Sequence, residues 1–455
     1  MTMRLLLLSA CCVTGTLWAE DPMGQPMGQE PGVVFDPFRG MDQNGRIPKI
    51  DYPADIQHPE RWRYIPEGRI KPGSMVERFW VTSFVTPIVF YEEDVGLGGG
   101  VAITDIDFRQ TRRQEFAGIF LSTTTEGQER YKVVWQRWLN HRSLPTGGVL
   151  MEERSYVRAS SGYDRSLTRR FYGLGSNSKE QDETSFTDEL SYAELNLQMT
   201  APHPGDDLVL RLGVHAEHRN LYRGRVQDRP STEDIYPTLV SYGDSYSSAW
   251  AQGLVRYDTR DSQHNPYRGY MLEATVDAAP VQRGANNSSN DMGAVWGVAG
   301  NYALPVPGLF HAGAEGKEEN PPTDVIAIGG FAQATSGDLP FWALPSLGGT
   351  DSLRGYIANR FTDRVAWHAS IEYRLWVISR GAAITDSIRF ERFGIAFFYE
   401  LGTVAPSIND VSDAKIHDSY GVSLRTMLER TALFRADMGW SAEGFAFTFG
   451  YGLSF

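Results

Sequence analysis

Hydrophobic and polar residues alternate along the chain from about residue 81 to its end, in segments of about ten residues separated by turn residues. The clearest segment is residues 445–455, where every second position is aromatic or leucine. These positions are Phe445, Phe447, Phe449, Tyr451, Leu453 and Phe455. Because a strand places successive side chains on opposite faces, the pattern predicts strands with one apolar and one small or polar face.

Two further segments, residues 365–377 and 393–402, alternate in the same way and carry a carboxylate on the less apolar face. Glu372 lies on that face in the first segment and Glu400 in the second. A carboxylate on the lipid face of a membrane barrel is penalised, so both side chains are predicted to point into the lumen. The sequence as a whole predicts an all-β fold, a transmembrane antiparallel β-barrel that fills residues 78–455.

Composition agrees with many short strands and excludes a helical membrane protein. The mean hydropathy is −0.34, and no apolar run after residue 20 approaches the roughly 18 residues that a spanning helix needs. The 23 Phe, 21 Tyr, 11 Trp and 46 Gly residues are typical of aromatic girdles and tight turns. The net charge of −13, without a Lys- or Arg-rich run, argues against a nucleic-acid partner.

The first nineteen residues have the features of an export signal. A basic start is followed by an apolar stretch from Leu5 to Val13 and by the small residue Ala19. A strand with an aromatic last residue, Phe455, in an exported chain resembles the insertion-signal strand of outer-membrane barrels. This combination favours a membrane barrel over a soluble sandwich, and it assigns Phe449, Tyr451, Leu453 and Phe455 to the insertion signal.

The signal contains a second candidate cleavage site, because Leu8-Ser9-Ala10-Cys11 also reads as a lipoprotein box. The apolar segment before Cys11 is short, so cleavage after Ala19 is the favoured reading, and lipidation of Cys11 stays open. Cleavage after Ala19 removes both cysteines of the chain, which then has neither disulfides nor thiol chemistry.

Residues 20–77 are rich in Pro, Gly and charge and show no sustained apolar periodicity. The segment is predicted to be a flexible periplasmic leader. With this length and composition it is not expected to form a POTRA domain, the periplasmic module that receives clients in larger barrel proteins.

The most specific stretch is residues 344–356, which resembles the lumen-loop motif of the BamA/TamA-type outer-membrane assembly-factor superfamily, also known as the bacterial surface antigen family. The resemblance implies a barrel of sixteen strands with one loop folded back into the lumen. It assigns Gly348, Gly349, Arg354, Gly355 and Tyr356 to the lumen-loop motif, with the arginine pairing with acidic residues on the barrel wall.

On this resemblance, Glu372 and Glu400 are the expected acidic partners of Arg354. The family's strand motif F-x-D-x-G stands here as residues 398–402, with Glu400 in place of Asp. A charge-assisted pair of this kind would hold the loop as an internal strut. Taken by itself, residues 348–351 would be an ordinary glycine-rich turn and Arg354 a solvated charge.

Three other stretches resemble the same family in the same order along the chain. Residues 95–100 are similar to its glycine-rich second barrel strand, residues 171–175 to its F-x-G-x-G element, and residues 257–270 to its D-T-R-D…P-x-R-G turn. The last is also an ordinary hairpin connection around Asn265-Pro266.

Signals for an enzyme or a cofactor are faint, and the chain is expected to be neither an enzyme nor a metalloprotein. Residues 243–245 read Gly-Asp-Ser, as at a lipase nucleophile, but no matching Asp-x-x-His follows. His215 and His218 stand three residues apart, which places them on opposite faces of a strand and away from a common metal ion.

The resemblance implies a role in membrane-protein insertion, translocation or outer-membrane remodelling. The alternatives are a gated pore or structural barrel without insertase activity and, remotely, an integral-membrane hydrolase. The expected location is the outer membrane with the leader in the periplasm. The expected partners are the lipid bilayer, the barrel-assembly machinery that inserts this chain, and a protein client or a second copy of the chain.

Overall fold

The computed structural model describes residues 50–67, 70, 83–92, 96–145, 147–240, 245–284, 291–313, 321–382, 390–428 and 432–455. The predicted signal, the first part of the predicted leader, Val95, Gly243 and Asp244 lie outside these residues. No helix in the described part of the chain is long and apolar enough to cross a membrane.

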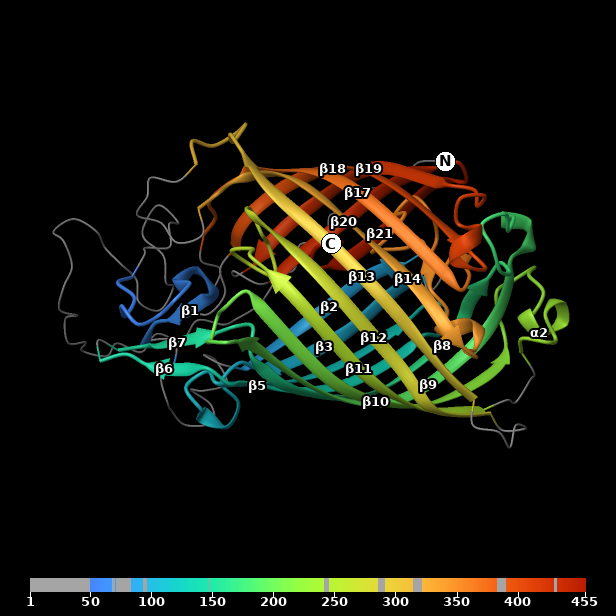
Figure 1. The fold of residues 1–455 in the computed structure, drawn as a ribbon, viewed down its shortest axis with the longest axis horizontal. Helices are drawn as coiled ribbons and strands as arrows, with labels where there is room; N and C mark the ends of the chain where they lie inside the picture. Colours follow the sequence, from blue (N-terminus) through green and yellow to red (C-terminus); the bar gives the residue numbers. More distant parts are fainter. Residues whose placement is uncertain are drawn as a thin grey trace.

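Sixteen antiparallel strands form one sheet that curls into a barrel (Figure 1), as the sequence predicted. In sheet order the strands are β2 (Ser83–Glu92), β3 (Gly96–Asp105), β4 (Glu115–Thr124), β5 (Glu129–Trp138), β8 (Tyr156–Phe171), β9 (Thr184–Ala201), β10 (Leu208–Arg223), β11 (Ser245–Asp258), β12 (Gly269–Gly284), β13 (Asp291–Val306), β14 (Asp324–Gly337), β17 (Val365–Ile378), β18 (Phe390–Ala405), β19 (His417–Leu428), β20 (Ala432–Ser441) and β21 (Gly444–Tyr451).

Smaller elements lie at the two ends of the barrel (Figure 1). One end, here called the β1 end, carries a three-stranded sheet in the order β1 (Trp62–Ile65), β7 (Val149–Glu152) and β6 (His141–Ser143). The other end, the α2 end, carries the one-turn helix α2 (Thr232–Ile235). The remaining elements are β15 (Ser346–Leu347), β16 (Phe361–Thr362) and the 3-10 turns η1 (Pro59–Arg61), η3 (Phe108–Gln110), η4 (Glu180–Asp182), η5 (Phe341–Ala343) and η6 (Ile408–Asp410).

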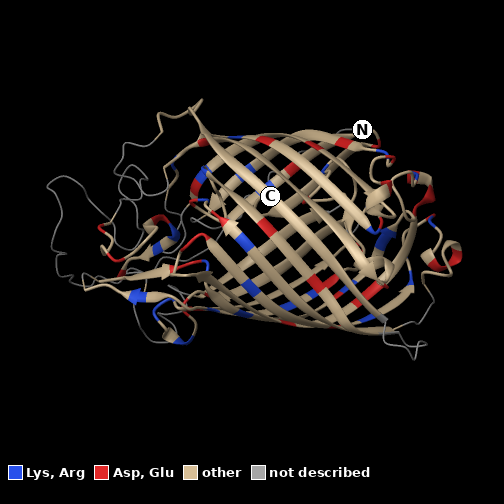
Figure 2. Cartoon of the chain, in the orientation of Figure 1, with Lys and Arg blue, Asp and Glu red and all other residues tan. Residues whose placement is uncertain are grey.

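The two faces of the wall follow the predicted alternation. Apolar side chains on the outer face are exposed, as at Leu212 (69%) and Leu272 (61%), whereas Glu372 and Glu400 are 0% exposed on the inner face. Figure 2 shows long uncharged stretches along the strands, with charges of both signs between them and at the barrel ends. An outer surface of this kind suits the hydrocarbon core of a bilayer.

The first and last strands of the sheet, β2 and β21, meet without forming a ladder. The ring centroids of Tyr91 and Phe447 are 6.4 Å apart across this junction. Within the described residues, however, β2 pairs in register with β3, and β21 with β20, but β2 and β21 do not pair with each other. The junction between β2 and β21 is called the seam below.

Strand length falls toward the seam. β9 has 18 residues and β10 has 16, whereas β2 has 10 and β21 has 8. At roughly 3.4 Å per residue, the wall is therefore roughly half as tall at the seam as at β9.

The prediction that the last strand runs to Phe455 is wrong, because β21 ends at Tyr451. Gly452 turns the chain with a φ of +82°, which a residue with a side chain rarely adopts, and its N–H donates to the Leu433 carbonyl at 2.8 Å. Of the four residues assigned to the insertion signal, only Phe449 and Tyr451 therefore lie on the strand.

The tail after Tyr451 packs against the inner wall instead of continuing the strand. The Ser454 hydroxyl donates to Glu372 Oε1 at 3.0 Å, and the Arg374 guanidinium lies 4.9 Å from the centre of the Phe455 ring. A Cβ on Gly329 would lie 2.2 Å from that ring, so the wall of β14 leaves the space that the ring fills. These lumen contacts explain why the alternating pattern does not end as strand.

The described part of the predicted leader contains structure that the sequence did not predict. Residues Trp62–Ile65 pair antiparallel with β7, and Ile65 and Ile70 pack with Val149 in a small apolar cluster. The Arg61 guanidinium is buried and donates to the Gly205 carbonyl and to Asp207, both at 2.5 Å. The β1 sheet is thus attached to the connection between β9 and β10.

A charge on the outer face near the middle of β10 should destabilise the barrel. Val214 is 57% exposed there, and Val214→Arg should lower the unfolding free energy by about 2–4 kcal/mol, because a guanidinium would be placed in hydrocarbon. Urea unfolding in lipid vesicles measures the change.

The control for this variant is His215→Arg, one position along the strand on the inner face beside Glu217. It should change the unfolding free energy by much less. Equal losses in the two variants would contradict the assignment of the faces.

Candidate functional site

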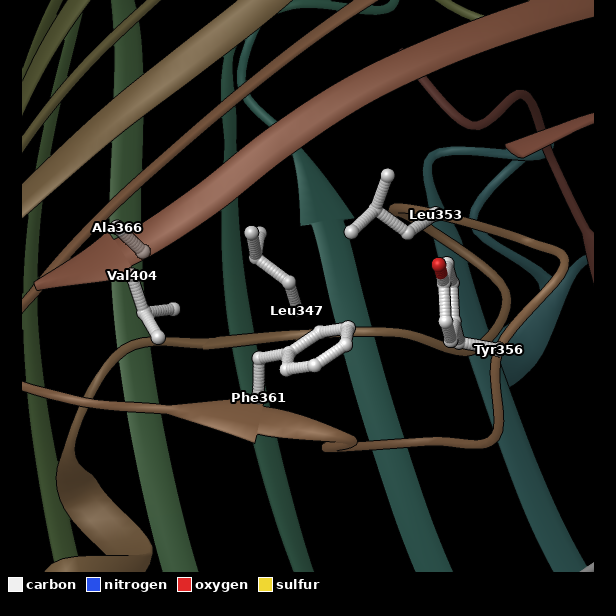
Figure 3. Packing of buried hydrophobic residues seen from close by; sticks show 6 residues of the cluster. All are labelled: Leu347, Leu353, Tyr356, Phe361, Ala366 and Val404. Carbon is white, nitrogen blue, oxygen red and sulfur yellow. The ribbon is translucent and has the colours of Figure 1, made fainter. Parts of the chain in front are cut away.

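The connection between β14 and β17, residues 338–364, folds back into the barrel. Its strands β15 and β16 pair antiparallel, and the hairpin they form packs against the inner wall. The contact is a buried hydrophobic cluster shown in Figure 3, in which four loop residues meet Ala366 of β17 and Val404 of β18. The loop residues are Leu347, Leu353, Tyr356 and Phe361.

Glycines allow the loop to turn and to approach the wall. Gly348 has a φ of +111°, and a Cβ there would lie 2.2 Å from the Ile357 carbonyl oxygen. A Cβ on Gly355 would lie 2.6 Å from the Trp440 carbonyl oxygen of β20. Side chains at these positions would therefore push the loop out of its turn or away from the wall.

Arg354 lies at the inner tip of the loop and is 0% exposed. Its Nε donates to Glu400 Oε1 at 2.9 Å, and its backbone N–H donates to Glu400 Oε2 at 2.7 Å. Its Nη2 donates to Glu372 Oε1 at 2.6 Å. These are the two carboxylates that the family resemblance assigned to this arginine, and the structure places both in contact with it.

A third carboxylate and an aromatic ring complete the surroundings of Arg354, and neither contact was predicted from the sequence. Nη1 approaches Asp437 Oδ1 of β20 at 3.4 Å, and the guanidinium lies 3.7 Å from the centre of the Phe398 ring. Burial by itself would lower the pKa of Arg354, but the charges of Glu372, Glu400 and Asp437 outweigh it and raise the pKa. The arginine is therefore held as a cation.

Other basic residues of the wall share the same carboxylates. Glu372 Oε2 accepts from Arg374 Nε and Arg425 Nη2, each at 2.7 Å. Asp437 Oδ2 accepts from Arg435 Nη1 at 2.9 Å, and Arg435 Nη2 donates to Asp351 of the lumen loop, also at 2.9 Å. The sequence contains a signal for Arg435 and Asp437, because the alternation of residues 432–441 places both on the same face of a strand.

This arrangement ties the loop to strands β17, β18 and β20 at once. Buried ion pairs offset the desolvation of their charges only when the geometry is good and the remaining hydrogen-bonding capacity is satisfied. Here each carboxylate accepts from at least two donors. The site therefore fixes the position of the loop.

The turn after β11 is a connection of residues 259–268 that side-chain hydrogen bonds hold in place. Asp258 accepts from Arg260 Nε and Nη2 at 2.8 and 2.9 Å, and Arg154 donates to the carbonyls of Asp258 and Arg260. Asp261 accepts from the backbone of Tyr267 at 3.1 Å, and burial raises its pKa to about 6. The turn thus anchors the connection between β5 and β8.

The other motif glycines also have packing roles. The Phe90 ring lies over Gly98, where a Cβ would be 2.3 Å from it. Gly175 donates its N–H to the Thr362 carbonyl of the lumen loop at 3.0 Å. The element at residues 171–175 therefore contacts the lumen loop.

The two histidines of β10 lie on opposite faces, as predicted. His215 Nε2 lies 3.5 Å from Glu217 on the inner face, and His218 Nδ1 lies 2.9 Å from the Ser247 hydroxyl on the outer face. They do not converge on one ion.

Comparisons with known proteins agree with this architecture. Residues 151–455 match the Omp85 superfamily domain. The fold is similar to that of CdiB from Escherichia coli, with a TM-score of 0.50 and 10% identity over 85% of this chain and 69% of that one. No curated protein matches the sequence.

Two other solved structures are similar at lower TM-scores. BamA from Haemophilus ducreyi lacking POTRA domains 1-3 has a TM-score of 0.49 and 14% identity, over 83% of this chain and 76% of that one. CdiB from Acinetobacter baumannii has a TM-score of 0.46 and 12% identity, over 82% of this chain and 59% of that one.

Removal of the Arg354 side chain should destabilise the barrel and free the loop. Arg354→Ala leaves Glu372, Glu400 and Asp437 buried without this cation, so the unfolding free energy should fall by about 3–5 kcal/mol. Arg354→Lys should lose less, because one charge remains without the planar fork of donors. Heat-modifiability on gels and urea unfolding measure both, and unchanged values for Arg354→Ala would contradict the strut.

Proposed function

The chain belongs to the Omp85 superfamily, and we propose that it acts at the outer membrane on polypeptide clients, which it inserts or translocates at the seam between β2 and β21. The observation that carries this proposal is the unpaired seam of the described sheet. An edge strand presents N–H and C=O groups that pair readily with another strand. A client segment in extended conformation is therefore the ligand that fits this place best.

Two features support the seam as the working part of the barrel. The short strands β2 and β21 reduce the height of the wall there, so the adjoining bilayer has to thin to match it. The tail after Tyr451 is turned into the lumen, where Ser454 contacts Glu372. It does not cover the edge of β2.

The lumen loop is proposed to keep the wall beside the seam rigid. Arg354 fixes the loop to β17, β18 and β20, so the wall next to β21 is held in place and the sheet opens at the seam, between β21 and β2. We propose that no covalent catalysis is involved. In this account the leader lies in the periplasm, and the partners are the bilayer, the machinery that inserts the chain, and a client or second copy of it.

A gated pore is the second candidate, and a difference between the two halves of the lumen favours it. Inner-face side chains on β5 and β10 keep contact with solvent, with 45% of Arg130 and 23% of His215 exposed. Those around the lumen loop, such as Glu400, are 0% exposed. Water that reaches the first group could carry ions along that half of the barrel.

The proposed function is tested by locking the seam. Tyr91→Cys and Phe447→Cys, in a background in which Cys11 and Cys12 are serine, can be joined by a short bifunctional maleimide. In proteoliposomes the lock should lower the rate at which an unfolded barrel client is inserted by about tenfold or more, because the client can no longer reach the edges.

The matched control joins Tyr131→Cys and Tyr163→Cys. These residues are paired directly across β5 and β8, away from the seam, with ring centroids 6.1 Å apart. This link should leave insertion unchanged. If locking the seam has no more effect than the control, the seam is not the client site, and conductance that persists in both would favour the pore.

A further inference from the structure

A second buried arginine of the lumen loop, Arg360, joins parts of the barrel that are far apart in the sequence. Its side chain is 1% exposed. Nε and Nη2 donate to the two carboxylate oxygens of Glu443, each at 2.7 Å. Nη1 and Nη2 donate to the hydroxyl and the carbonyl of Ser178 at 3.0 and 2.9 Å. The guanidinium also lies 4.4 Å from the centre of the Tyr172 ring.

The partners of Arg360 come from two different structural units. Glu443 lies in the hairpin between β20 and β21, and β21 is the seam strand. Ser178 lies in the connection between β8 and β9, residues 172–183, at the α2 end. Through the loop, Arg360 therefore connects the seam hairpin with the connection between β8 and β9.

The connection at residues 172–183 also holds a third loop. The Ser176 carbonyl lies 2.8 Å from His417 Nε2, and its hydroxyl accepts from the Lys415 N–H at 3.1 Å. The His417 ring stacks on Phe361 of the lumen loop at 3.7 Å. Residues 172–183, 338–364 and 406–417 thus contact one another, and they are called the mouth below.

We infer that the Arg360–Glu443 pair is a clasp that makes the seam and the mouth open together. If β21 moves away from β2, its hairpin either draws the lumen loop with it or loses both charge-assisted hydrogen bonds to Arg360. Two hydrogen bonds join Arg360 to Glu443, so the contact depends on the relative orientation of the two side chains as well as on their distance. This inference rests on the proposed function, because coupling is useful only in a barrel whose seam opens.

Arg360 differs in this respect from Arg354. Arg354 contacts the walls of β17, β18 and β20, whereas Arg360 contacts the hairpin that ends at the seam strand. Arg360 and Glu443 are positioning residues, and their effect should extend to backbone groups on the other side of the seam. A purely local structural contact would not have that effect.

Hydrogen exchange with mass spectrometry on the full chain in nanodiscs tests the clasp without any client. Glu443→Ala should speed exchange by about tenfold in three regions at once, namely the lumen loop, residues 172–183, and the seam strands β2 and β21. The reason is that the variant lacks the contact with Arg360 that opposes opening in all three regions. Glu443→Asp, which keeps the carboxylate, should restore most of the protection. If Glu443→Ala does not fold, Glu443→Gln serves in the same comparison.

The control is Glu126→Ala, which removes an exposed glutamate from the hairpin between β4 and β5 at the same end. It should leave the three regions unchanged. Faster exchange confined to the hairpin and residues 358–362, with β2 and residues 172–183 unchanged, would overturn the clasp.

The two proposals fail separately, because exchange is measured without a client and insertion with one. If exchange speeds up in all three regions but the barrel inserts no client, the clasp stands and the proposed function is contradicted. If clients are inserted normally but exchange does not change in the three regions together, the proposed function stands and the clasp is contradicted.

Discussion

The structure depends on the burial of one cation, Arg354, inside the barrel. A guanidinium without water is stable only where carboxylates and hydrogen bonds replace its hydration. Glu372, Glu400 and Asp437 supply them from three different strands. Because β17, β18 and β20 lie close together in the sheet, the loop that carries the arginine is held against one side of the wall.

This constraint distinguishes the wall that the lumen loop holds from the seam, where the described strands β2 and β21 form no ladder. Strands β17 to β20 are tied through the lumen loop, while β2 and β21 meet at the seam without a ladder in the described sheet. The turn at Gly452 sends the tail inward, and the Phe455 ring fills the space over Gly329.

Much of this was predictable from residue patterns, because a period of two reports directly on which face a side chain takes. The barrel, the inward direction of Glu372 and Glu400, and their pairing with Arg354 followed from alternation and family resemblance. The end of β21 at Tyr451 was not predictable in this way. Residues 452–455 keep the alternating pattern of a strand, and the contacts that turn them into the lumen are with residues far away in the sequence. The strand β1 was also missed, since pairing with β7 depends on a partner almost ninety residues away. Arg360 and Glu443 stand in loops, where no periodicity signals a contact.

Site-specific photocrosslinking in growing cells tests most directly whether the seam receives clients, with a photoreactive phenylalanine analogue placed at Tyr91 beside the seam or at Tyr163 of β8, away from the seam. We expect nascent outer-membrane polypeptides to be captured from Tyr91 and not from Tyr163, although both side chains face the bilayer. Equal capture from the two positions, or capture of lipid alone from both, would contradict a seam that receives clients.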